Sequence, residues 1–257
     1  MTAPLIERLD AGVALERWDD IPAAELESGT PVQNGYFYVD DADNGLMAGV
    51  WDCTAMTTVM APYPVNEFMI LLDGEVTMIE ENGRETLVRA GESFVIPKGL
   101  PCRWKNDVYV KKFFVIFEDK SGKIHTDIGK VGVIKPDPRG SLAPADPPAA
   151  DSLLGPVPDW RDHTWFTDAT GQWRVGAWRS TAFHRKPETI ARHELMHIVE
   201  GAVTLPDGQG GTQRFAAGDT LMVPLGAHYE WDSAEPVRKL YCSFTPNAAA
   251  GAAAGAE

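Results

Sequence analysis

The sequence aligns with itself without a gap when it is shifted by 127 residues, and this repeat constrains the fold more than any other feature. Between residues 49–117 and 176–244, 18 of 69 positions are identical. The matched residues include glycines, prolines and tryptophans, such as Trp104 with Trp231, which mark turns and packing positions rather than generic surface. Because two copies are too few for a stacked solenoid, we expect two domains of the same fold.

Each copy has the pattern of an all-β domain. In the first copy, the apolar run 68–72 ends at Asp73-Gly74, which is a turn signal. The next segment, 75–80, leads into Asn82-Gly83, a pair that favours a tight hairpin because both residues tolerate positive φ. Short apolar segments separated by turn residues every ~8 to 12 positions are typical of a sandwich or barrel of antiparallel strands.

The segments outside the two copies have a different composition. Residues 136–158 hold seven prolines among Ala, Asp, Ser and Gly, which favours an extended linker. Residues 247–257 are almost entirely Ala and Gly, and we expect this tail to be disordered. The expected segments are an N-terminal extension 1–30, a first barrel 31–120, a Pro-rich linker 121–158, a second barrel 159–246 and the tail 247–257.

The segment RHELMHIVEG, residues 192–201, contains the H-E-x-x-H pattern of zinc proteases. That pattern works only on a helix, where residues four apart share a face, because on a strand they are about 13 Å apart. The equivalent segment of the first copy is NEFMILLDG, which is typical of a strand and has Asn66 and Ile70 in place of His193 and His197. We therefore predict a strand here and reject the zinc-protease interpretation.

Composition argues against several classes of partner. A net charge of −14 disfavours nucleic acid and anionic membranes, because neutralising phosphates needs clustered Lys and Arg. The three cysteines are odd in number and far apart, so no disulfide framework is expected. The N-terminus lacks a basic segment followed by an apolar run, and no apolar run reaches the roughly 18 residues of a membrane span. We expect a cytoplasmic protein that binds a small-molecule ligand.

The pattern Glu-x6-Gly, then Gly-x5-Pro-x-Gly, then a Trp, occurs in both copies and resembles the two signature motifs of the cupin superfamily. The run from Trp104 to Lys112, repeated in the second copy, is similar to the cupin family that includes ureidoglycine aminohydrolases. The resemblance covers about 36–118 and 163–245 and implies a bicupin, two tandem jelly-roll barrels with a pocket in each. Cupins commonly dimerise through edge strands, so the resemblance also implies a homodimer, with a monomer as the alternative.

Metal-binding cupins supply two His, a Glu and a later His, a set that suits manganese, iron or zinc. At these positions the first copy has Ala61, Tyr63, Glu67 and Cys102. The second copy has Glu188, Ile190, Glu194 and Tyr229, with His228 beside the last position. The resemblance leaves two alternatives open: a divalent metal (Mn, Fe or Zn) held by Glu188, Glu194 and His228 in the second barrel, or no metal.

The repeated glutamates, Glu67 and Glu194, fall on the inward, apolar faces of their expected strands. A buried carboxylate must be paired or neutralised, and Lys112 and Lys239 recur inside apolar strands. We therefore predict two buried pairs, Glu67 with Lys112 and Glu194 with Lys239. They are either structural salt bridges or catalytic acid–base pairs whose pKa values are moved by burial. The other residues expected to line the pockets are Tyr63, Cys102, Trp104, Tyr229 and Trp231.

Two functions remain open at this point. The resemblance implies a hydrolase or lyase of the aminohydrolase type that releases ammonia from a small polar, nitrogen-containing metabolite. In that case Glu188, Glu194 and His228 would hold the metal and Lys239 would orient the substrate. The degenerate ligand positions favour the alternative, a non-catalytic, metal-free protein that binds or senses a small molecule.

Overall fold

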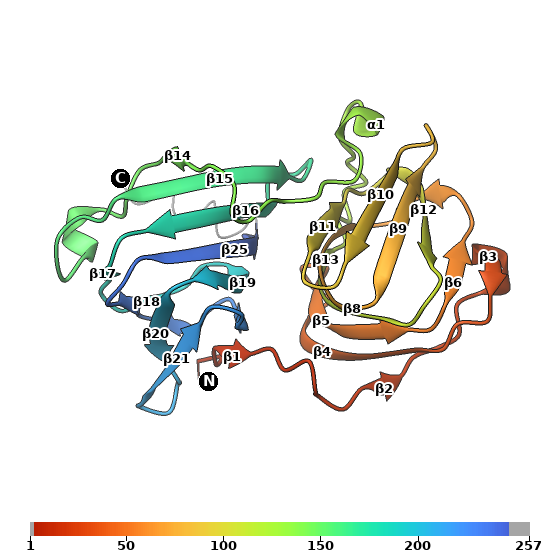
Figure 1. The fold of residues 1–257 in the computed structure, drawn as a ribbon. Helices are drawn as coiled ribbons and strands as arrows, with labels where there is room; N and C mark the ends of the chain where they lie inside the picture. Colours follow the sequence, from red (N-terminus) through yellow and green to blue (C-terminus); the bar gives the residue numbers. More distant parts are fainter. Residues whose placement is uncertain (1–2, 247–257) are drawn as a thin grey trace. The chain divides into compact units, whose positions relative to one another are not determined.

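The computed structural model describes residues 3–246, which form two compact units built almost entirely of strands (Figure 1). The first unit comprises residues 10–136 with 168–170, and the second comprises residues 3–9, 137–167 and 171–246. Each unit contains one copy of the repeat, so the prediction of an all-β chain with two similar barrels is confirmed. The tail 247–257, expected to be disordered, lies outside the described residues.

The first barrel consists of two facing antiparallel sheets. One contains, in spatial order, β11 (Ser93–Ile96), β8 (Asn66–Asp73), β13 (Val110–Phe117), β5 (Leu46–Cys53), β4 (Gln33–Asp41) and β2 (Glu16–Arg17). The other contains β10 (Glu85–Arg89), β9 (Glu75–Glu80), β12 (Pro101–Asn106), β6 (Met56–Thr58) and β3 (Leu26–Gly29), with β7 (Ala61–Pro62) also paired to β12. Their inward apolar side chains form one core, which includes Trp51, Met78, Phe94 and Trp104.

The second barrel repeats this arrangement. Its larger sheet contains β1 (Glu7–Arg8), β22 (Thr220–Val223), β19 (His193–Glu200), β25 (Val237–Phe244), β16 (Trp173–Ser180), β15 (Trp160–Thr167) and β14 (Ala143–Pro144). The smaller sheets contain β17 (Phe183–His184), β24 (Asp232–Ser233), β20 (Ala202–Pro206) and β21 (Thr212–Ala216), and the pair β18 (Glu188–Thr189) with β23 (His228–Tyr229). The core includes Trp178, Phe183, Met196 and Trp231.

The helical segments are short. Two 3-10 turns, η1 (Ala23–Glu25) and η2 (Ala150–Ser152), and one turn of α-helix, α1 (Ile128–Val131), lie outside the sheets. Within residues 3–246, no helix has the length and apolar character needed to cross a membrane.

The segments outside the repeat contribute strands to the barrels. At the N-terminus, β1 pairs with β22 of the second barrel, and Ile6 beside it is only 4% exposed in the second core. The following residues belong to the first unit, where β2 and β3 extend its two sheets. Ile134 pairs with Val95 of the first barrel, whereas β14 pairs with β15 of the second. The segments 1–30 and 121–158 are therefore divided between the two barrels.

The H-E-x-x-H segment lies on β19, an interior strand between β22 and β25, so the strand prediction is confirmed. Its two histidines have different partners. His193 Nδ1 accepts the backbone N–H of Leu225 over 3.3 Å, and His197 Nδ1 lies 2.9 Å from Thr220 Oγ1. This geometry does not bring both imidazoles to one zinc ion.

The same irregularity interrupts both barrels. The register between β8 and β13 skips Leu72, and the register between β19 and β25 skips Val199. The glycines that follow, Gly74 and Gly201, both have a φ of 75°, in the region that favours glycine. A Cβ on Gly201 would also lie 2.1 Å from the carbonyl oxygen of Pro236, so this turn has no room for a side chain.

We predict that Gly201→Ala destabilises its barrel more than Gly83→Ala destabilises the first barrel. Both positions have positive φ, 75° and 82°, but a Cβ on Gly83 meets nothing within 4 Å. Gly83→Ala therefore carries only the conformational cost, about 1–2 kcal/mol. Thermal unfolding followed by circular dichroism should show a Tm decrease at least ~4 °C larger for Gly201→Ala. Equal decreases would contradict the steric account of this turn.

Candidate functional site

Each barrel contains a buried ion pair between a lysine and a glutamate on neighbouring strands. The distance from Lys112 Nζ to Glu67 Oε1 is 2.8 Å, and the distance from Lys239 Nζ to Glu194 Oε1 is 2.6 Å. None of these four side chains is more than 8% exposed. The two predicted pairs are therefore present, between β8 and β13 and between β19 and β25.

Each lysine also lies against two indole rings. Lys112 Nζ is 4.5 Å from the centre of the Trp51 ring and 4.8 Å from that of Trp104. In the second barrel, Lys239 Nζ is 5.1 Å and 5.3 Å from the ring centres of Trp178 and Trp231. Ammonium groups at such distances are attracted by the negative faces of aromatic rings. The lysine, the glutamate and the two tryptophans are identical in both copies, and we call each set of four the ion-pair scaffold.

The second oxygen of the glutamate is held differently in the two barrels. In the first, the Tyr63 hydroxyl donates a hydrogen bond to Glu67 Oε2. In the second, Arg192 Nε donates to Glu194 Oε2 over 2.7 Å. Burial acts to raise the pKa of Glu194, but the charges of Arg192 and Lys239 outweigh it and lower the pKa to about 2. The glutamate of the second barrel is therefore bound by one more positive charge than the glutamate of the first.

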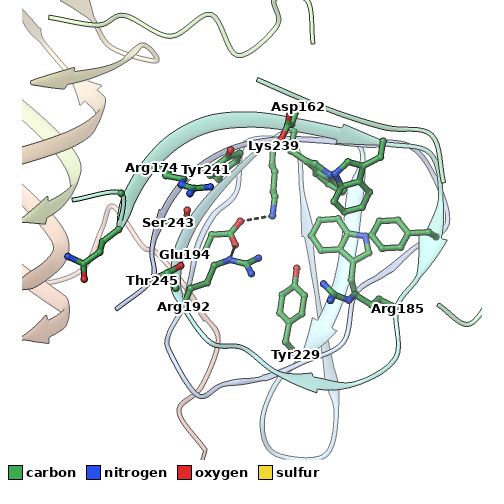
Figure 2. Close-up of a pocket in the computed structure, with 16 residues that line it drawn as sticks. Asp162, Arg174, Arg185, Arg192, Glu194, Tyr229, Lys239, Tyr241, Ser243 and Thr245 are labelled. Atoms are coloured by element: carbon green, nitrogen blue, oxygen red, sulfur yellow. Dashed lines mark hydrogen bonds and ion pairs between the residues drawn. The ribbon is translucent and has the colours of Figure 1, made fainter. Parts of the chain in front are cut away.

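The second barrel has a cavity of about 470 Å³ beside this group (Figure 2). Small-molecule sites typically have volumes of about 300–1,000 Å³. The cavity is lined by Trp160, Asp162, Gly171, Gln172, Arg174, Trp178, Phe183, Arg185, Arg192, Glu194, Tyr229, Trp231, Lys239, Tyr241, Ser243 and Thr245. Four of these side chains are cationic and two are anionic, so the lining has an excess of positive charge in a chain with a net charge of −14.

One part of the lining is a continuous aromatic cluster. The ring centres of Trp160 and Trp178 are 4.5 Å apart, and those of Trp160 and Phe183 are 5.6 Å apart. Trp231 joins the cluster at 5.1 Å from Trp178 and 5.7 Å from Phe183. The cavity therefore offers an apolar wall beside charged groups, which suits a ligand with one apolar and one charged end.

Arg192 and Tyr229 both carry donors that have no acceptor among residues 3–246. Figure 2 shows the Arg192 guanidinium and the Tyr229 hydroxyl pointing into the cavity. Within residues 3–246, the Arg192 guanidinium bonds only through Nε to Glu194, and the Tyr229 hydroxyl makes no hydrogen bond. Tyr229 is 4% exposed, and burial, together with the charge of Glu194, raises its pKa, so its hydroxyl stays protonated. An oxygen acceptor in the cavity would satisfy both donors.

The predicted site residues fall into two groups. Four of them line the cavity of the second barrel: Glu194, Lys239, Tyr229 and Trp231. Five come together at the equivalent place in the first barrel: Glu67, Lys112, Tyr63, Cys102 and Trp104. Burial raises the pKa of the Cys102 thiol to about 12, so it is not a reactive thiolate at neutral pH.

The structure does not bring Glu188, Glu194 and His228, the candidate metal ligands, together. Neighbouring residues on a strand point to opposite faces, so His228 points away from the cavity that Tyr229 lines. Glu188 accepts from Arg185 Nη2 over 2.9 Å, and both oxygens of Glu194 hold cations. Within residues 3–246, no three His, Cys, Asp or Glu side chains are grouped so as to hold a metal ion. These side chains do not fit a divalent cation.

Three cationic residues of the cavity are absent from the predicted site. They are Arg174, Arg185 and Arg192, which stand where the first copy has Met47, Thr58 and Val65. Positions that are identical in the two copies belong to the scaffold that both barrels share. Residues that would contact a ligand in only one barrel are expected at positions where the copies differ. At each of these three positions the second copy has an arginine where the first copy has an uncharged residue, and this difference is the sequence signal that identifies the three arginines.

The chain is similar to known proteins over most of its length. The family model described as the EutQ-like cupin domain matches residues 41–114 and again 167–241. A protein of unknown function from Pseudomonas syringae pv. tomato DC3000, of the DUF861 family, is 27% identical with a TM-score of 0.76, over 93% of this chain and 99% of its own.

More distant structures are similar in fold alone. The DUF861 protein Ylba from E. coli is 11% identical, with a TM-score of 0.52 over 94% of this chain and 93% of its own. A cupin 2 conserved barrel domain protein from Leptotrichia buccalis is 8% identical, with a TM-score of 0.52 over 91% of this chain and 99% of its own. No curated protein matches the chain.

We predict that Lys112→Met destabilises the protein more than Lys239→Met. Loss of Lys112 leaves its glutamate with one neutral partner, Tyr63, whereas after loss of Lys239 the glutamate keeps Arg192. Leaving a buried charge without its partner costs about 3–5 kcal/mol. Urea unfolding should show a loss in this range for Lys112→Met and about half of it or less for Lys239→Met. Similar losses for the two variants would argue against the compensating role of Arg192.

The low pKa of Glu194 predicts that the second barrel is sensitive to acid. A carboxylate with an ordinary pKa of 4.5 and a folded-state pKa of about 2 contributes stability above pH 4.5 that is lost as the pH falls towards 2. This contribution is at most roughly 3 kcal/mol. The free energy of unfolding of Glu194→Gln, measured across this window, should therefore decrease less than that of the unaltered protein. Parallel pH profiles would contradict the assignment.

Proposed function

From the premise that this chain belongs to the family of EutQ-like cupin domains, we propose that its second barrel binds a small organic anion without a metal ion. The observation that carries the proposal is the pair of donors, Arg192 and Tyr229, that face the cavity with no acceptor among residues 3–246. A guanidinium edge beside a hydroxyl suits the two oxygens of a carboxylate. Hydrogen bonds assisted by charge are also the stronger ones.

The guanidinium of Arg192 is fixed in position before a ligand arrives. Its Nε bonds to Glu194 over 2.7 Å, and Lys239 holds the other oxygen of the same carboxylate. The free Nη edge is thereby oriented towards the cavity, which lowers the entropy lost when a ligand binds. Arg174, an exposed residue of the lining, adds a positive charge that attracts anions to the cavity.

The alternative, an ammonia-releasing enzyme of the type that includes ureidoglycine aminohydrolases, has less support. A general base works best when its pKa lies near the working pH, and a pKa of about 2 makes Glu194 a weak base. Burial lowers the pKa of Lys239 against the attraction of Glu194, but its ammonium is engaged by that carboxylate and by two indoles. Both side chains are therefore better suited to hold Arg192 and the cavity wall than to transfer protons.

The expected location and assembly belong to the same proposal. A cytoplasmic location is supported by three free cysteines, Cys53, Cys102 and Cys242, which suit a reducing compartment. A homodimer stays a prediction, to be checked by light scattering of the purified protein.

We predict that cyclohexylacetate binds to the protein and that its uncharged amide binds much more weakly. Arg192→Gln should weaken carboxylate binding about 10- to 100-fold, because it removes charge-assisted hydrogen bonds. Isothermal titration calorimetry provides the measurement. Dialysis of the protein against EDTA should leave the affinity unchanged.

The matched control is Arg161→Gln. It also replaces an arginine by glutamine, but Arg161 lies on β15, is paired with Asp159 and does not line the cavity. It should leave the affinity for cyclohexylacetate unchanged. Equal affinities for the carboxylate and its amide, or equal losses in the two arginine variants, would contradict the proposal.

A further inference from the structure

The strands that begin the two barrels are equivalent residue by residue. β2 pairs with β4, and β14 pairs with β15, in the same register at an offset of 127 residues. The backbone N–H of Trp18 donates to the carbonyl of Gln33 over 3.1 Å, and that of Ala145 donates to the carbonyl of Trp160 over 2.9 Å. The repeat therefore extends to these strands, and Ala145 is the counterpart of Trp18.

The indole of Trp18 fills one end of the first barrel. A Cβ on Gly35 would lie 2.1 Å from this ring, so the indole sits on the inward face of β4, where Gly35 is opposite Trp51. The indole stacks on Phe37, with ring centres 4.9 Å apart, and meets the edge of Phe114 at 6.2 Å. Only glycine at position 35 leaves room for the ring.

The equivalent end of the second barrel is part of the cavity. Ala145 replaces Trp18, while Asp162 and Tyr241 replace Gly35 and Phe114. Both Asp162 and Tyr241 line the cavity and are labelled in Figure 2. The chain thus supplies an aromatic ring to the first barrel and none at the equivalent position, Ala145, of the second, where Asp162 and Tyr241 line the cavity.

We propose that the anion of the second barrel is an aromatic carboxylate whose ring occupies the space corresponding to the Trp18 indole, an inference that rests on the proposed function. Its carboxylate binds Arg192 and Tyr229, and its ring contacts the aromatic cluster at Trp160. Asp162 has no hydrogen-bond partner among residues 3–246 and accepts an N–H of the ring, such as that of an indole. Indole-3-acetate is therefore the probe of choice.

The first test compares ligands on the unaltered protein and does not depend on the folding of a variant. Calorimetry should give an affinity for indole-3-acetate at least about tenfold higher than for cyclohexylacetate, which has the same charge and a non-aromatic ring. Equal affinities would overturn the aromatic preference and leave the anion site standing. If neither compound binds, the proposed function fails together with this inference.

The second test rebuilds the ring of the first barrel in the second. The double variant Ala145→Trp, Asp162→Gly should bind indole-3-acetate at least about tenfold more weakly than Asp162→Gly alone, because only the double variant fills the space of the ligand ring. Leu154→Trp is the control, because it adds an indole at a residue of the same unit that is 53% exposed and does not line the cavity. A folded double variant that binds indole-3-acetate as tightly as Asp162→Gly alone would overturn the inference.

Discussion

The buried pair of lysine and glutamate, held between two indole rings, is the interaction on which both barrels depend. It joins two neighbouring interior strands of the larger sheet in each barrel, next to a register shift that occurs at the same place in both. The buried lysine and glutamate are stable only as a pair, since loss of one leaves the charge of the other unpaired. This explains why all four members of the scaffold are identical in the two copies, although most other interior residues differ.

The two barrels differ in how they complete that set. A neutral tyrosine hydroxyl completes it in the first barrel, where the rings of Trp18 and Phe114 pack edge to face. A guanidinium completes it in the second, and the additional charge needs water or an anion because apolar rings cannot solvate it. One substitution, Val65 in the first copy against Arg192 in the second, thus accompanies the charged cavity of the second barrel.

Much of the fold follows from local sequence chemistry. The turn at Asn82-Gly83, the strand at 193–200 and the two ion pairs follow from backbone preferences, from alternation and from the cost of an unpaired buried charge. The residues of the candidate site are harder to predict from local sequence patterns. His228 is not brought to Glu194 because it lies one residue out of phase with the inward face, an offset that is fixed by strand pairing. The three arginines of the cavity stand at positions where the two copies differ, so the shared motifs do not identify them as site residues.

The path of the chain has a consequence for how the barrels can be separated. Residues 3–9 belong to the second unit, residues 10–136 to the first, and the chain then returns to the second. A polypeptide that begins at residue 137 would lack β1, so the edge of β22 would be unpaired and the site of Ile6 in the second core would be empty. A cut at this linker would yield two fragments that recognise each other, because the N-terminal fragment carries a strand whose partner lies in the other. In this chain an N-terminal peptide thus supplies an edge strand to a sheet whose other strands lie more than a hundred residues further along the sequence.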